Sequence, residues 1–183
     1  KDFDVEKWRE KIGFVAQKAF LFKGTIRSNV CFGKADATDD EIMEALELAQ
    51  ATEFVASKED GIDSVIEENA ANLSGGQKQR LSIARAVIRK PDIYIFDDAF
   101  SALDFKTDAA LRKALKPVTK NSIMFIVAQR ISTIMDADKI LVLNHGKLEA
   151  VGTHEDLMEN CPLYKNIAES QIGEEAIDYG EEA

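Results

Sequence analysis

Short apolar runs alternate with amphipathic segments along most of this chain. Residues 1–11 are charged and amphipathic, and they lead into an apolar run at residues 12–16 whose length fits a buried strand. After a short turn near residues 25–29, the spacing of apolar positions predicts a helix over residues 38–50 and a longer one over residues 74–89. The first third of the chain therefore favours helices and is expected to form a lobe of its own.

The rest of the chain alternates more regularly between strands and helices. We expect strands at residues 93–96, 123–127 and 140–143, helices at residues 106–115, near 132 and at 153–159, and a hairpin through residues 144–147 that returns along 148–151. Pro117 is expected to close the helix that precedes it. Apolar strands alternating with helices predict an α/β fold in which a mostly parallel sheet is covered on both faces.

Composition and charge narrow the class of protein. A chain of 183 residues with 45% apolar content can form one domain with a core, and its net charge of −10 argues against a nucleic-acid-binding surface. The longest apolar run, residues 123–128, is far too short to span a bilayer. Cys31 and Cys161 fit no metal or redox spacing and favour a reducing compartment. Residues 174–183 carry five acidic side chains and no basic one, which predicts a disordered tail.

The most informative segment is residues 73–80, which read Leu-Ser-Gly-Gly-Gln-Lys-Gln-Arg. Ser74 stands at the N-cap of the predicted helix, and Gln77 completes the spacing of a capping box. A helix start of this kind presents free backbone N–H groups and a positive dipole end, which suit a phosphate, and the two glycines allow a close approach. The alternative for this segment alone is a well-capped surface helix.

A second motif, residues 92–98, reads Asp-Ile-Tyr-Ile-Phe-Asp-Asp. An apolar strand here ends in two carboxylates, Asp97 and Asp98, at the edge where α/β folds place their ligands. A carboxylate at that edge suits Mg²⁺, which retains waters and takes one or two carboxylate ligands. The alternative is an aspartate that caps the following loop. Residues 99–104, Ala-Phe-Ser-Ala-Leu-Asp, follow at once, and the whole combination is improbable by chance.

Together these segments resemble the nucleotide-binding domain of ATP-binding cassette (ABC) transporters, over roughly residues 14–168. The resemblance implies a mostly parallel, RecA-like sheet flanked by helices, a helical signature lobe at about 18–90, a core part at about 91–160, and ATP and Mg²⁺ as ligands. The resemblance assigns Gln17 to the Q-loop glutamine near the metal and Asp97 to the Walker B metal ligand. It assigns Asp98 to the position of the catalytic acid and Gln129 to the switch position. Nucleotide binding through the signature and the D-loop is assigned to Ser74, Gly75, Gly76, Gln77 and Asp104.

Three departures limit what the resemblance implies. No glycine-rich loop ending in Lys-Ser or Lys-Thr occurs in the sequence. We therefore expect residues 1–173 to form a partial cassette that lacks the N-terminal strands and the phosphate-binding loop. Such a partial cassette is expected to bind ATP weakly on its own. Asp98 stands where active members have glutamate, and it is one methylene shorter, which corresponds to a loss on the order of 10²–10⁴ in rate. Gln129 stands where they have histidine, and it cannot carry a proton or a positive charge.

The resemblance also implies partners. In the family two cassettes bind head to tail, and each ATP site pairs the Walker motifs of one with the signature of the other. This chain is therefore expected to belong to a heterodimer, with Asp98 and Gln129 in a degenerate site and an intact signature facing a different subunit. Residues 20–26 and 152–157 resemble the exporter branch, which implies a transmembrane domain in the same polypeptide and a location at the cytoplasmic face of a cell membrane.

Two other functions stay open. One is a regulatory and dimerisation module that holds ATP without hydrolysing it, which Asp98 and Gln129 favour. The other is a soluble relative used in chromosome or DNA-repair machinery, which the acidic charge disfavours. Those relatives insert long coiled coils ahead of the signature, and residues 31–72 are too short for one.

Two local features have open interpretations. The apolar residues Phe20, Leu21 and Phe22 are either ordinary core or a docking surface for a helix of the membrane domain. Arg80 and Arg85 are expected to pair with acidic side chains on their own surface rather than to bind nucleotide.

Overall fold

The computed structural model describes residues 4–178, which form two compact units, the first ending at Val127 and the second beginning at Ala128. The first unit contains the helices α1 (Val5–Glu10), α2 (Ile26–Cys31), α3 (Asp39–Leu48), α4 (Thr52–Ala56), α5 (Gly75–Val87) and α6 (Phe105–Val118). Its strands are β1 (Ile12–Val15), β2 (Gly24–Thr25), β3 (Val65–Ile66), β4 (Ile93–Asp97) and β5 (Ile123–Val127). Two short 3₁₀ helices, η1 (Gly61–Asp63) and η2 (Glu68–Ala70), lie on either side of β3 in the sequence.

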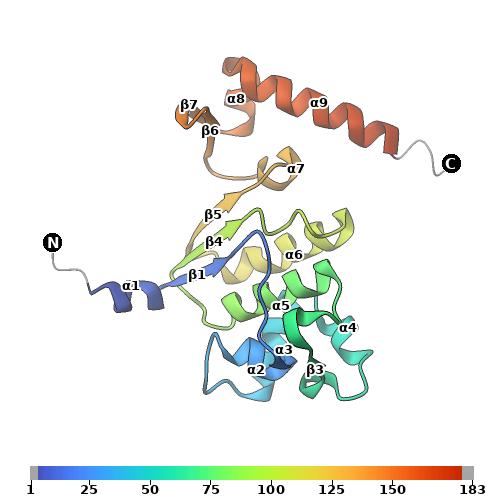
Figure 1. Ribbon diagram of the computed structural model, residues 1–183. Coiled ribbons are helices and arrows are strands. Elements are labelled where there is room, and N and C mark those ends of the chain that lie inside the picture. Colours follow the sequence, from blue (N-terminus) through green and yellow to red (C-terminus); the bar gives the residue numbers. More distant parts are fainter. Residues whose placement is uncertain (1–3, 179–183) are drawn as a thin grey trace. The chain divides into compact units, whose positions relative to one another are not determined.

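A three-stranded parallel sheet forms the centre of the first unit, in the order β1-β4-β5 (Figure 1). Phe14 of β1 is paired with Ile95 of β4, which is paired in turn with Phe125 of β5. Because paired residues on parallel strands share a face, these three side chains point to one side of the sheet. The prediction of an α/β fold with a mostly parallel sheet is confirmed.

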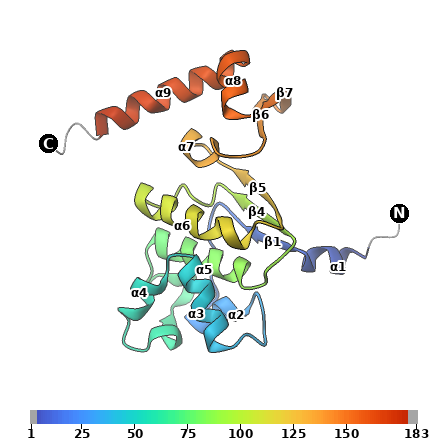
Figure 2. The ribbon, with the colours of Figure 1, turned by 180° about the vertical axis from the view of Figure 1, so that it is seen from behind.

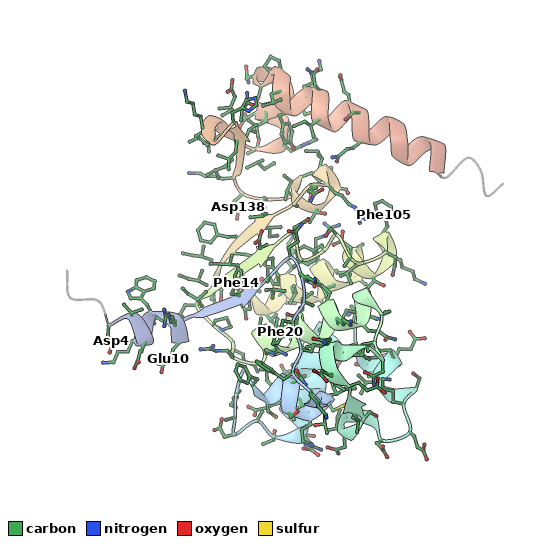
Figure 3. The ribbon with its side chains drawn as sticks, in the orientation of Figure 1. Asp4, Glu10, Phe14, Phe20, Phe105 and Asp138 are labelled. Carbon is green, nitrogen blue, oxygen red and sulfur yellow. The ribbon has the colours of Figure 1, made fainter. Side chains whose placement is uncertain are left out.

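The two faces of this sheet have different surroundings. One face packs against α5 and α6 (Figure 2). Its side chains Tyr94 and Phe96 are buried with Leu81 and Leu111 from those helices. The opposite face carries apolar side chains that are each more than half exposed, namely Phe14, Ile123, Phe125 and Val127. Figure 3 shows Phe14 on β1. We expected helices to cover both faces of the sheet, and within this unit they cover one of them.

Side-chain caps explain where the helices of the first unit begin. Thr38 and Glu41 form a capping box at the start of α3, as the sequence predicts. Thr25 and Ser28 form another at the start of α2, so the turn expected near residues 25–29 is in fact a short helix. Pro117 lies inside the last turn of α6 rather than ending it, because the N–H of Thr119 still donates to the carbonyl of Leu115 and closes the turn beyond the proline.

The second unit joins an antiparallel hairpin to two helices. It contains α7 (Ile131–Ile134), β6 (Ile140–Asn144), β7 (Lys147–Gly152), α8 (His154–Asn160) and α9 (Pro162–Asp178). The predicted hairpin turn is confirmed, and both of its central residues, His145 and Gly146, have positive φ angles of 46° and 77°, as a type I′ turn requires. Its small core contains Ile140, Val142, Leu157, Cys161 and Tyr164.

Helix α9 was not predicted from the sequence pattern. It extends through Asp178, so residues 174–178 of the expected disordered tail are helical, as the good helix formers Glu174, Glu175 and Ala176 permit, and residues 179–183 lie outside the described range. A separate helical lobe at residues 18–90 stays a prediction, since the boundary between the units falls after Val127. None of the helices within residues 4–178 combines the length and the apolarity that crossing a bilayer requires.

Candidate functional site

The carboxyl end of β4 places two acidic residues side by side. Asp97 is the last residue of the strand, and Asp98 follows with a φ angle of 48°, in the left-handed region that is unfavourable for a residue with a side chain. Its N–H donates to the carbonyl of Val127 over 2.8 Å, and its carbonyl accepts from the hydroxyl of Ser101 over 2.8 Å. Such backbone conformations cost about 1–3 kcal/mol and persist where neighbouring contacts enforce them, often at functional sites.

Gln17 reaches this end of the sheet from the segment after β1. Its Nε2 donates to Oδ2 of Asp98 over 2.9 Å, although the two residues are 81 positions apart in the sequence. The contact follows from the strand order, because β1 and β4 are neighbours whose carboxyl ends meet at one edge. Since the nitrogen of the amide is used as the donor, its oxygen Oε1 remains an acceptor that can bind a cation. The structure thus brings two predicted site residues together.

The start of α5 has the cap that its sequence predicts. Ser74 Oγ accepts from the N–H of Gln77 over 3.2 Å, and Gln77 Oε1 accepts from the N–H of Ser74 over 3.0 Å. The capping box is therefore confirmed. Ser74 and Gly75 are exposed, and a side chain added at Gly75 would meet no atom within 4 Å. The N–H groups of Gly75 and Gly76 are among the first-turn donors that a helix leaves without internal partners.

Gly76 faces the loop that follows the acidic pair. A Cβ atom at this position would lie 3.3 Å from the carbonyl oxygen of Ala102 and 3.8 Å from Cδ2 of Leu103. The glycine therefore allows the Leu-Ser-Gly-Gly-Gln and Ser-Ala-Leu-Asp segments to pack closely within one chain. Asp104 ends the loop as the N-cap of α6, where both the N–H and the hydroxyl of Thr107 donate to it over 2.8 Å. These hydrogen bonds hold the pKa of Asp104 below its usual value.

A residue that the sequence analysis missed connects these segments. Gln79 of α5 is 1% exposed, and its Nε2 donates to the carbonyl of Ala16 over 3.0 Å, next to Gln17. The pattern carried a signal for it, because Gln79 lies at helical spacing with the buried residues Ile83 and Ala86. A glutamine on the buried stripe of a helix requires a partner.

The expected acidic partner is wrong for Arg85, whereas Arg80 interacts electrostatically with Asp104 and Glu53. Arg85 donates to the carbonyls of Phe20 and Asn29 over 2.9 Å each, and its guanidinium lies over the ring of Phe22 at 5.5 Å. Arg80 donates to the carbonyl of Gln50 and lies over an aromatic ring in the same way. Burial lowers the pKa of each guanidinium. Both side chains point from α5 toward α2–α4, where backbone carbonyls replace carboxylates as acceptors.

Arg85 borders a cluster of exposed phenylalanines on the first unit. Phe20, Phe22 and Phe32 are 61%, 41% and 68% exposed, whereas Leu21 belongs to the core. The ring centroid of Phe22 lies 5.0 Å from that of Phe20 and 4.8 Å from that of Phe32. Figure 3 shows Phe20 after β1. Each of the two interpretations of residues 20–22 therefore holds for part of the segment, since Leu21 is core and the phenylalanines are on the surface. Phe20, Phe22 and Phe32 form a surface patch, called here the Phe20 patch.

Gln129 lies in the second unit, so its position is described apart from that of Asp98. Its carbonyl accepts from Nε2 of Gln171 over 2.7 Å. Among residues 4–178, no group of three or more His, Cys, Asp or Glu side chains is arranged to hold a metal ion. A Mg²⁺ ion that is bound mainly by water and phosphate oxygens needs fewer protein ligands than such a group supplies. Asp97 and the oxygen of Gln17 fit that requirement.

Comparison with protein families and curated proteins gives consistent results. The model of the ABC transporter family matches residues 1–101. An uncharacterised ABC transporter ATP-binding protein, YfiB of Bacillus subtilis strain 168, is 47% identical over 96% of this chain and 30% of its own length. A putative export ATP-binding/permease protein of Rickettsia felis is 44% identical over 90% of this chain and 28% of its own length. The chain thus spans about 30% of the length of the curated relatives it matches.

A solved structure is similar across most of the chain. It is described as a bacterial Atm1-family ABC exporter with ATP bound, and it superposes with a TM-score of 0.88 at 36% identity. The match covers 91% of this chain and 30% of the exporter chain.

Proposed function

This chain belongs to the ABC transporter family, and from that premise we propose that it is the ATP-binding part of an exporter that couples ATP binding and hydrolysis to transport. The observation that carries the proposal is the capped start of α5, where Gly75 is exposed and Gly76 lies against the loop after β4. One segment that suits a phosphate and one that suits Mg²⁺ are thereby held in a single unit. The similarity to an exporter described with ATP bound supports ATP as the ligand.

The signature half of the proposed site uses Ser74, Gly75, Gly76 and Gln77. Ser74 and Gln77 satisfy each other, so their capping box fixes the direction of the first helical turn. The N–H groups of that turn and the helix dipole then face outward, toward a nucleotide held by another subunit. The exposure of Gly75 supports this direction. We propose a head-to-tail dimer with a second cassette, in which this half completes the partner's ATP site.

The hydrolytic half of the proposed site uses Gln17, Asp97, Asp98 and Gln129. Asp97 and the oxygen of Gln17 would hold Mg²⁺, which would neutralise phosphate charge when bound. Asp98 would orient or deprotonate the attacking water, but its carboxylate is one methylene shorter than glutamate and already accepts a hydrogen bond from Gln17. Gln129 would hydrogen-bond the terminal phosphate without supplying charge. We propose that hydrolysis at this half is slow.

The Phe20 patch is proposed to contact a membrane-embedded part of the same transporter. Its three phenylalanines are exposed beside the Gln17 segment, and Asn29 fixes the backbone of Phe22 through two hydrogen bonds of 2.8 Å. The relative named as an export ATP-binding/permease protein supports a permease portion in one polypeptide with the cassette. A contact here would transmit changes at Gln17 to the transport path. The cassette would then lie at the cytoplasmic face of a membrane.

The test compares two acid-to-alanine variants in the full transporter. Asp98→Ala in this chain is expected to lower steady-state ATPase activity less than twofold, because a partner's catalytic acid carries the turnover. Changing the partner's corresponding acid is expected to lower activity by about 10²–10⁴. If Asp98→Ala abolishes turnover as completely as the partner change does, the degenerate-site proposal is wrong.

A second function, a regulatory module that holds ATP, is favoured by one observation. Asp98 is 6% exposed and its Oδ2 is already bonded to Gln17, so this carboxylate is poorly available to an incoming water. A single-turnover experiment with the assembled pair separates the two functions. ATP retained by this half over many turnovers of the other half indicates a regulatory role, and ATP hydrolysed slowly at this half indicates a catalytic one.

A further inference from the structure

One side chain of α9 bridges two backbone groups beside Gln129. Gln171 Oε1 accepts from the N–H of Ile131 over 2.7 Å, and Gln171 Nε2 donates to the carbonyl of Gln129 over 2.7 Å. All three residues belong to the second unit, in which α9 packs against α7 (Figure 1). Both polar ends of a single amide therefore hold the chain on the two sides of Arg130.

Gln171 is half-buried and lies on the same side of its helix as the buried residues near the helix start. Cys161, Tyr164 and Ala168 form the buried stripe of α9 and its start, and their spacing of three and four residues continues to position 171. A polar group there loses hydration and must recover it through hydrogen bonds. Gln171 does so at both ends of its amide.

The start of α7 lacks the usual local cap. Its N-cap residue, Arg130, makes no side-chain hydrogen bond to the first turn. The N–H of Ile131 is one of the first-turn donors that a helix leaves unsatisfied unless a cap or another group accepts from it. Gln171 supplies the acceptor from a different helix. The same amide thereby fixes both where α7 begins and where the backbone of Gln129 lies.

We propose that Gln171 is a positioning residue for Gln129. By holding the carbonyl of Gln129 and the N–H of Ile131, it fixes the backbone from which the Gln129 side chain extends. The proposal rests on the function proposed above, in which Gln129 is a phosphate-binding residue. Gln171 itself does not touch the nucleotide, so its effect passes through Gln129.

The test uses the full transporter with three substitutions in this chain. Gln171→Leu places an apolar side chain of similar size at this half-buried position and removes both hydrogen bonds. Gln171→Glu keeps an acceptor for the N–H of Ile131 but places a carboxylate oxygen against the carbonyl of Gln129. Asn166→Ala is the matched control, an amide removed from an exposed position of the same helix. Affinity at this site is measured separately for ATP and for ADP, because the terminal phosphate distinguishes them.

Gln171→Leu is expected to weaken ATP binding about tenfold and to leave ADP binding unchanged, since one hydrogen bond to the terminal phosphate is lost. Gln171→Glu is expected to have an effect of the same size, and Asn166→Ala none. In a Gln129→Ala background, Gln171→Leu is expected to cause no further loss. Equal losses for ATP and ADP, or losses that multiply in the double variant, would overturn the proposal, because they indicate a general structural role.

Amide hydrogen exchange over residues 128–135 identifies which step fails. Faster exchange of the Ile131 amide in Gln171→Leu, with exchange in β6 unchanged, is expected if the amide holds this segment. If exchange is unchanged, Gln171 does not hold the segment and the proposal is wrong. If exchange rises but Gln129→Ala leaves the preference for ATP over ADP intact, the phosphate role of Gln129 is wrong, and the positioning role fails with it.

Discussion

This chain contributes two halves to the proposed ATP sites, one to a partner's site and one to its own, and these are built in different ways. The signature half is local: Ser74 and Gln77 are three residues apart and satisfy each other at the start of α5. The hydrolytic half joins residues 81 positions apart, Gln17 and Asp98, and keeps Asp98 in an unfavourable backbone conformation. The geometry of a motif built from neighbouring residues is kept as long as those residues are kept. The half assembled from distant strands carries the departures from the family pattern, and we propose that its chemistry is the weaker of the two.

The largest expected effect comes from changing the signature half. A Cβ atom added at Gly76 would lie 3.3 Å from the carbonyl oxygen of Ala102, so the branched side chain of Gly76→Val is crowded there. The same side chain blocks the approach of a phosphate to the helix start. Steady-state ATPase activity of the full transporter is expected to fall by about 10²-fold or more, as on loss of an electrostatic contact to the reacting phosphate. Retention of activity in Gly76→Val would mean that this half does not complete an ATP site.

Gly75→Ala separates packing from nucleotide approach in the same assay. An added Cβ there meets no atom of this chain within 4 Å, so a loss of activity with unchanged unfolding would arise on the nucleotide side.

The next largest effect concerns the hydrolytic half, where the substitution is expected to raise the rate of hydrolysis rather than lower it. Asp98→Glu restores the methylene that active members carry, and it is expected to raise the single-turnover rate at this half by about tenfold to 10²-fold. Rapid-quench measurement of one turnover, with the partner's acid inactivated, isolates this half. Asp98→Asn is the control, because it keeps the shape and a hydrogen bond to Gln17 but cannot act as a base. An unchanged rate in Asp98→Glu would assign the slow step to Gln129 or to another residue.

Features set by neighbouring residues could be predicted from the sequence. The caps at Thr38 and Ser74, the strands β4 and β5 and the hairpin turn at Gly146 depend on short-range spacing and backbone preference, and the structure agrees. Helix α9 was missed because its apolar positions do not form a strong one-sided pattern. The place of Pro117 was mispredicted because one missing hydrogen bond does not end a helix whose next residues still pair.

Features set by distant residues could not be predicted in the same way. The two carboxylates at the end of β4 could be placed at the ligand-binding edge from general rules for α/β sheets, but the bond from Gln17 to Asp98 depends on the strand order β1-β4-β5. The partners of Gln79 and Arg85 are backbone carbonyls of other segments, and a sequence does not identify such acceptors. The residues named for ATP and Mg²⁺ binding stay predictions until ligand binding is measured.

A smaller effect is expected where the two halves are connected. Gln79→Leu removes the hydrogen bond to Ala16 and leaves that carbonyl without this donor, which is expected to lower the free energy of unfolding by about 1–3 kcal/mol. Urea unfolding of the chain measures the change. Gln77→Leu is the matched control on the exposed side of α5, and it should cost at most about 1 kcal/mol through the capping box. Equal costs for the two variants would show that the buried contact contributes no more than the surface one.

The smallest effect concerns Asp104 and depends on pH. Its carboxylate accepts two hydrogen bonds from Thr107, which depress its pKa in the folded state. A depressed pKa stabilises the fold above the unfolded-state value, about 4 for aspartate, and this stabilisation is lost as the pH falls through the folded-state value. Asp104→Ala is therefore expected to cost about 1 kcal/mol at pH 7, with the difference from the unmodified chain shrinking below pH 4.

Asp104→Asn separates the cap from the charge. Asparagine is as good an N-cap as aspartate but does not titrate, so this variant should retain most of the stability at pH 7 and should lose none of it through this position on acidification. Unfolding curves at pH 7 and below pH 4 for the three proteins provide the comparison. A cost for Asp104→Ala that is the same at both pH values would mean that the charge of Asp104 contributes nothing to holding the start of α6, and that its hydrogen bonds to Thr107 alone provide the cap.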